Sequence, residues 1–136
     1  MIKLTKTKLV AMLLITTTLL MINSVKVSAD AGTPFTVAGV TIYIGSYAYA
    51  STANAYTNAA NPNSGIMCKI TYSKYVAADP YTGDRYIDER YNVEHQGSAS
   101  VSFSCPIGYQ TLSIVTDHYA YYGSAHGGDH TEDIYP

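Results

Sequence analysis

The stretch Gly97–Thr116 constrains the fold more than any other part of the chain. Serine alternates there with an apolar residue at four successive positions, which are Ala99, Val101, Phe103 and Cys105. This period of two is typical of a strand with one face in a core and one in water. The Pro-Ile-Gly sequence at 106–108 ends the strand, because proline cannot donate to a ladder and glycine adopts the positive φ of tight corners.

Similar patterns predict strands along the rest of the chain, separated by runs of turn-forming residues. The predicted strands are 35–45, 46–57, 66–76, 85–93, 98–105, 109–122 and a short last segment at 131–135, and the predicted loops are 58–65, 77–84 and 123–130. About six or seven short strands with turns at this spacing predict a small all-β, antiparallel β-sandwich of immunoglobulin-like size.

The same patterns predict which side chains face the core. The predicted inward residues are Ile66, Cys68, Ile70, Tyr72, Lys74 and Val76 on one strand, Ile87, Glu89, Tyr91 and Val93 on the next, and Leu112 and Ile114 on the strand after residue 109. Gly39 is a candidate bulge within 35–45.

Residues 1–29 read as a signal peptide that precedes a single domain, 30–136. Three lysines come before an apolar run from Leu9 to Ile22, and Val27-Ser28-Ala29 offers small residues for cleavage. The run is shorter than the roughly 20 residues that span a bilayer, so an uncleaved anchor is the weaker interpretation. We therefore expect a secreted, extracellular protein with no membrane span in the mature chain, and the lysine-bearing leader favours a bacterial source.

The net charge of the predicted mature chain indicates which kinds of partner to expect. Four of the eight lysines and arginines lie in the leader, whereas all ten acids follow it, so the mature chain carries a net charge of −6 (four minus ten). Nucleic acids and anionic membranes call for clustered basic residues. The expected partner is instead an extracellular protein or glycan.

The two cysteines, Cys68 and Cys105, both fall on predicted apolar faces of a secreted chain. A disulfide is the default prediction in an oxidising compartment, and it would contribute about 3 to 4 kcal/mol by chain-entropy arguments. If the bond forms, the strand 98–105 cannot continue a plain meander beside 85–93. The sequence then favours its crossing into a second sheet.

The other polar clusters allow more than one interpretation. His118, His126, Asp129 and His130 are the candidate ligands of a zinc or copper ion, with a solvated glycine-rich loop as the alternative. Asp79, Asp84 and Asp88 fit a turn better than a calcium loop. Glu89 and Glu94 are predicted to lie on opposite faces of their strand, which argues against a glycosidase pair.

The fourteen tyrosines, in a chain without tryptophan, are the remaining functional signal. Tyrosine gives large amphipathic contact area at low entropic cost. The candidate binding residues are Tyr81, Tyr86, Tyr119, Tyr121 and Tyr122.

No known catalytic motif is present, so we expect a non-enzymatic protein without a cofactor. The predicted function is an extracellular binding module. A secreted antibacterial or toxin-like effector acting on a cell envelope is the alternative, and a small hydrolase is the third possibility.

Overall fold

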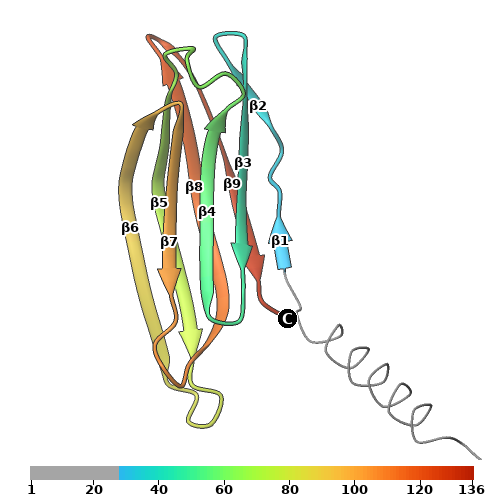
Figure 1. Cartoon of the computed structure of the whole chain (residues 1–136), viewed down its shortest axis with the longest axis vertical. Helices are drawn as coiled ribbons and strands as arrows, with labels where there is room; N and C mark the ends of the chain where they lie inside the picture. Colours follow the sequence, from blue (N-terminus) through green and yellow to red (C-terminus); the bar gives the residue numbers. More distant parts are fainter. Residues whose placement is uncertain (1–27) are drawn as a thin grey trace, which may run out of the picture.

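The computed structural model describes residues 28–136, which form two antiparallel sheets and no helix (Figure 1). Sheet A has the order β1-β3-β4-β7, with β2 also paired to β3, and sheet B has the order β6-β5-β8-β9. The strands are β1 (Ser28–Asp30), β2 (Phe35–Val37), β3 (Val40–Ala48), β4 (Thr52–Ala59), β5 (Met67–Ala78), β6 (Arg85–Gln96), β7 (Ser98–Ser104), β8 (Gln110–Tyr122) and β9 (Ala125–Ile134). The all-β, antiparallel prediction is confirmed. The predicted signal peptide lies almost wholly outside the described residues and stays a prediction.

The serine-alternating stretch forms strand β7 as predicted. Its serines are exposed, whereas Ala99, Val101 and Phe103 are buried. Gly97, at a φ of 78°, turns the chain out of β6, and β7 then pairs with β4 of the other sheet. Strand β7 therefore crosses to the other sheet, although the sequence predicted this crossing only if a disulfide forms.

The disulfide that motivated this crossing is absent, and that prediction is wrong: Cys68 and Cys105 are free thiols. Cys105 packs against the core cluster that contains Tyr75, and Cys68 belongs to a second cluster. Cys68 and Tyr75 lie seven residues apart on β5, or roughly 23 Å at the strand rise. Bridged cysteines need Cα atoms within about 7 Å.

Two predicted strands are in fact hairpins. The stretch 35–45 turns at Ala38 and Gly39, which have φ values of 47° and 78°, so Gly39 is part of a tight turn between β2 and β3 rather than a bulge. The positive φ at both positions matches the two-residue turns that suit the right-handed twist of hairpins. The stretch 46–57 is likewise divided by a turn at 49–51 between β3 and β4.

The alternation of faces changes phase in the middle of sheet B. The register of β5 against β8 shifts between Ile70 and Tyr72, and Asn92 on β6 has a φ of 52°. Beyond this point Ser73, Tyr75 and Ala77 are buried. The predicted inward positions of Tyr72, Lys74, Val76, Ile87, Glu89 and Tyr91 are therefore wrong, because a bulge moves every later side chain to the other face.

A second register shift, between Val76 and Ala77, has the same effect on β8. Thr111 is buried and Leu112 is 37% exposed, so the predicted inward position of Leu112 is also wrong. Ile114 is buried as predicted.

The interior between the two sheets contains two apolar clusters. Tyr75 of β5 is fully buried and stacks on Phe103 of β7, with ring centroids 5.3 Å apart. The Tyr75 hydroxyl bonds Thr111 Oγ1 at 2.9 Å, which satisfies the polar group that burial of a tyrosine brings with it.

Candidate functional site

The stretch predicted as a glycine-rich loop, 123–130, is mostly strand. Only Gly123 and Ser124 turn the chain, and β9 begins at Ala125. Glycine is needed within this strand, because a Cβ at Gly127 would meet the Phe35 ring at 2.8 Å and one at Gly128 would meet His118 O at 2.6 Å. The loop prediction is therefore wrong, and the candidate metal ligands lie on a sheet.

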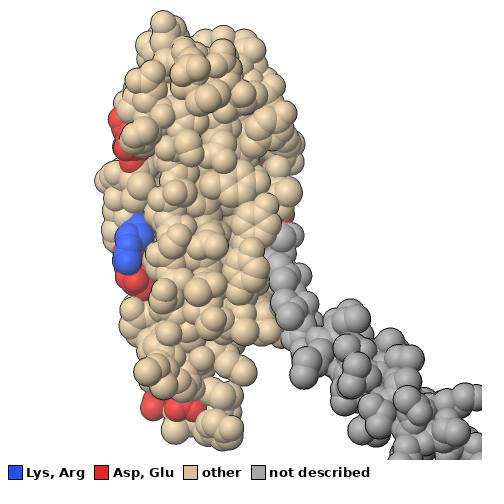
Figure 2. Space-filling model, in the orientation of Figure 1, with Lys and Arg blue, Asp and Glu red and all other residues tan. Residues whose placement is uncertain are grey.

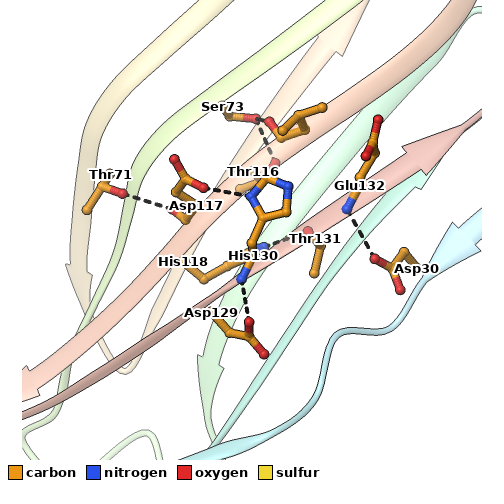
Figure 3. A network of polar contacts seen from close by, with 11 residues as sticks. Asp30, Thr71, Ser73, Thr116, Asp117, His118, Asp129, His130, Thr131 and Glu132 are labelled. Carbon is orange, nitrogen blue, oxygen red and sulfur yellow. Dashed lines mark hydrogen bonds and ion pairs between the residues drawn. The ribbon is translucent and has the colours of Figure 1, made fainter.

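The sheet separates those ligands rather than gathering them. His118 faces the interior, whereas the His130 imidazole lies outside and pairs with Asp117 at 2.7 Å (Figure 3). The His126 ring stacks against Tyr119, and Asp129 Oδ1 accepts a bond from the His130 amide. Among residues 28–136, no three His, Cys, Asp or Glu side chains are placed to hold a metal ion.

His118 instead joins the two sheets through a buried hydrogen-bond network. Thr57 of β4 donates its hydroxyl proton to Lys69 O at 3.3 Å, so its oxygen accepts from His118 Nδ1 at 2.9 Å. His118 Nε2 then accepts from the Thr131 hydroxyl at 2.8 Å. Burial lowers the pKa of His118 to about 4, so the ring is neutral at physiological pH.

The remaining acidic candidates have local partners. Asp79 Oδ1 accepts bonds from the amides of Tyr81 and Thr82, which is the geometry of a turn and lowers the pKa of its carboxyl. Glu89 and Glu94 both face outward, so their predicted placement on opposite faces is wrong, because the phase change lies between them. They stay five residues apart along β6, roughly 16 Å, beyond the reach of a glycosidase pair.

The candidate tyrosines do not converge on one site. Tyr119 and Tyr121 are neighbours on the outside of sheet B, with ring centroids 6.0 Å apart, and Tyr122 follows at the strand end, 53% exposed. Tyr81 lies on the turn after β5, at the other end of that 12-residue strand. Tyr86 packs edge-on between Tyr75 and Tyr109, so it is a core residue.

The outer surface of sheet B, which we call the charged face, carries tyrosines and ionised groups in cross-strand pairs. Both carboxylate oxygens of Glu89 accept bonds, from the hydroxyls of Tyr72 at 2.7 Å and Tyr91 at 2.9 Å. The Tyr121 hydroxyl donates to Glu94. The tyrosines and ionisable residues of the charged face are Lys69, Tyr72, Lys74, Glu89, Tyr91, Glu94, Asp117, Tyr119, Tyr121, His126, His130 and Glu132.

These pairs occupy several of the polar groups of the charged face. The bond to Glu89 raises the pKa of Tyr72 to about 12 and lowers the pKa of the Glu89 carboxyl. Lys69 adds an ion pair to Glu94 at 3.6 Å. The polar groups of this face therefore stabilise one another across the strands.

The outer surface of sheet A, which we call the uncharged face, has a different chemistry. Strands β2, β3, β4 and β7 contain no Asp, Glu, Lys or Arg. Figure 2 shows this side of the molecule, with the charged side chains at its margins and none in its middle. The uncharged face comprises Tyr43, Gly45, Tyr47, Thr52, Asn54, Tyr56, Asn58, Ser98, Ser100, Ser102 and Ser104.

Two tyrosine rings dominate the middle of the uncharged face. Tyr47 and Tyr56 lie 5.9 Å apart at 20° to each other, with their hydroxyls 3.5 Å apart. Tyr56 lies directly across the strand pair from Gly45, where a Cβ would come within 2.8 Å of the ring hydroxyl. Glycine at position 45 thus lets the Tyr56 ring lie against the sheet.

None of the sequence predictions includes this face, although the distribution of charged residues along the chain indicates it. No charged residue occurs between Asp30 and Lys69, nor between Gly97 and Thr116, and these two runs supply nearly all of sheet A. Because they are far apart in sequence, only the pairing of β4 with β7 makes them one surface.

Comparison with known proteins adds no relative: no family model, curated protein or solved structure matches the chain. Residues 28–136 include no helix that is long and apolar enough to cross a membrane.

Proposed function

We propose that this protein is a secreted, non-catalytic β-sandwich that acts by binding a protein or glycan outside the cell. The observation that carries the proposal is the set of tyrosine pairs held across strands on the outer faces of both sheets. The Tyr47–Tyr56 and Tyr72–Tyr91 rings are fixed by neighbouring strands and by their own hydroxyl bonds. Aromatic groups fixed in this way bind with little loss of side-chain entropy.

The surroundings of the ionisable groups favour binding over catalysis. A general acid or base needs a perturbed pKa near the working pH and access to substrate. His118 is buried and has its pKa lowered, and both oxygens of Glu89 are bonded to tyrosines. Neither group is arranged to exchange protons with a substrate.

The test is a binding screen of residues 30–136 on arrays of extracellular glycans and surface proteins. We expect saturable binding to at least one class of ligand. The double variant Tyr47→Ala/Tyr56→Ala removes the tyrosine pair of the uncharged face, and Tyr72→Ala/Tyr91→Ala removes a pair from the charged face. The proposal fails if the wild-type protein binds nothing on either array, or if neither double variant weakens the binding that is found.

A further inference from the structure

We infer that the uncharged face is the ligand-binding surface and that its ligand is an uncharged glycan chain. This inference rests on the proposed binding function and adds the face and the chemical class of the ligand. Three independent observations carry it: the absence of charge, the presentation of the aromatic rings and the unpaired polar groups around them.

The absence of charge selects against ionic ligands. All described Asp, Glu, Lys and Arg residues after Asp30 lie on sheet B or its loops, so the uncharged face offers no counter-ion to a sulfate, phosphate or carboxylate. The acidic mature chain also repels polyanions at longer range. When a neutral ligand binds this surface, no charged group loses its hydration and no electrostatic repulsion arises.

The two tyrosine rings lie side by side on the sheet. Tyr56 lies over Gly45, Tyr47 lies next to it at nearly the same inclination, and both side chains are partly exposed. The C–H groups on one side of a pyranose ring form an apolar patch that packs on an aromatic ring. Two adjacent rings fixed by β3 and β4 therefore suit successive sugars of a chain.

The polar groups around the rings are open to a ligand. Within residues 28–136, the side chains of Asn54, Ser100 and Ser102 make no hydrogen bond to another part of the protein. Asn54 pairs with Tyr47 and Ser102 across the strands, and Ser100 pairs with Tyr56. Each ring thus has an amide or hydroxyl beside it that can donate hydrogen bonds to, and accept them from, the hydroxyl groups of a sugar.

A protein partner fits this face less well. Protein interfaces are anchored by aromatic, arginine or aliphatic side chains that enter desolvated pockets. The outward positions of β3, β4 and β7 supply tyrosine, asparagine, serine, threonine and glycine, without an arginine or an exposed aliphatic side chain. The composition of the face matches a hydroxyl-rich ligand better than an apolar anchor.

The experiment is affinity electrophoresis and calorimetry of residues 30–136 with uncharged polysaccharides and oligosaccharides. The probes are hydroxyethylcellulose, glucomannan, dextran and acetylated chito-oligosaccharides, with heparin and polygalacturonate as charged comparators. We expect binding to at least one neutral probe, with an affinity that changes less than twofold between roughly 0.1 and 1 M salt. Heparin and polygalacturonate are expected not to bind.

The variants separate the two faces. Tyr56→Ala is expected to weaken binding tenfold or more, as for an aromatic residue at the centre of an interface, whereas Tyr56→Phe keeps the ring and most of the affinity. Tyr72→Ala is the matched truncation that distinguishes the charged face from the uncharged face. Ile87→Ala, at an exposed position on the outside of β6, is the control that we expect to leave the affinity unchanged. Circular dichroism of each variant verifies that the fold is retained, and Tyr47→Ala, which removes the other ring of the pair, supplies the test if Tyr56→Ala unfolds.

Several outcomes overturn the inference without removing the proposed function. They are neutral-glycan binding that is lost in Tyr72→Ala and kept in Tyr56→Ala, binding only to charged probes, and binding only to a protein of the array. A concentration-dependent dimer that Tyr56→Ala dissociates would also overturn it, because a second copy would then cover the face. Absence of binding to every glycan and every protein would remove the inference and the proposed function together.

Discussion

The outer faces of the two sheets carry similar numbers of tyrosines but use them differently. On the charged face, the hydroxyls of Tyr72, Tyr91 and Tyr121 are bonded to glutamates. On the uncharged face, Tyr47 and Tyr56 bond only each other, and the asparagine and serines beside them are unpaired within the described chain. Tyrosine content alone therefore does not identify a binding surface; the partners of each hydroxyl decide whether the ring serves the fold or is available to a ligand.

The largest expected effect concerns His118, the buried group that joins the two sheets. The unfolded histidine gains a proton as the pH falls below its ordinary pKa of 6.5, whereas the folded ring stays neutral until about pH 4. Because the unfolded state binds the proton first, acid favours unfolding. We expect the free energy of unfolding to fall by about 2 kcal/mol from this group between pH 7 and pH 5.

Denaturant titrations at several pH values measure this loss. His118→Gln removes the titrating group and is expected to flatten the pH dependence above pH 5. His95→Gln is the matched control, because His95 is exposed and bonds only a backbone oxygen. A slope that disappears in the His95 variant and persists in the His118 variant would contradict the assignment.

A smaller effect is expected from Gly45→Ala on the uncharged face. The added methyl group meets the Tyr56 ring and displaces it, which we expect to cost about 1 kcal/mol of stability by overpacking. The bond to Tyr47 raises the pKa of Tyr56 to about 12, so displacement also returns this pKa toward 10. Spectrophotometric titration of the tyrosines measures the change, and an unaltered titration curve would show that the ring does not depend on Gly45.

The matched change on the charged face is Glu89→Gln. It removes the carboxylate that raises the pKa of Tyr72 to about 12, and the pKa of Tyr91 is raised by the same group. We expect both tyrosines to titrate closer to pH 10 in the variant, with ligand binding unchanged. Loss of ligand binding in this variant would mean that the two faces do not differ in function as described.

The smallest expected effect concerns the two cysteines, whose thiols we expect to be free. Cys68 lies in sheet B and is fully buried, and Cys105 lies at the end of β7 and is partly accessible. We expect the same mass with and without reductant, fast alkylation of Cys105, and alkylation of Cys68 only after unfolding. A mass two hydrogens lower without reductant would restore the disulfide and require the two sheets to shift.

The strands were largely predictable from sequence. Which side chains face the core was predictable only as far as the first β-bulge of each strand. Period-two alternation located β7 and β8, but the shift beside Thr71 inverted every later position on β5, and nothing local marks that residue as a bulge. The hairpin turn between β2 and β3 was not predicted, because alanine rarely adopts the positive φ that Ala38 has there. The glycines of β9 resembled a loop because the groups that leave no room for a side chain, the Phe35 ring at Gly127 and the His118 carbonyl at Gly128, are evident only from the strand pairing.

The candidate site was less predictable than the fold. The tyrosines were recognised as the functional signal, but those of the uncharged face were not among the candidates, because their surface arises from β3, β4 and β7 together. The disulfide was predicted from an oxidising compartment and from the apolar positions of both cysteines, and the distance along β5 contradicts it.

The most direct test of the difference between the two faces is a nuclear magnetic resonance titration of isotope-labelled residues 30–136 with the neutral glycan that binds most tightly. We expect shift changes concentrated on β3, β4 and β7, around Tyr47, Tyr56 and Ser100, with the resonances of Tyr72 and Tyr119 unmoved. Shift changes centred on Tyr72, Tyr119 and Tyr121 would contradict this expectation and assign binding to the charged face.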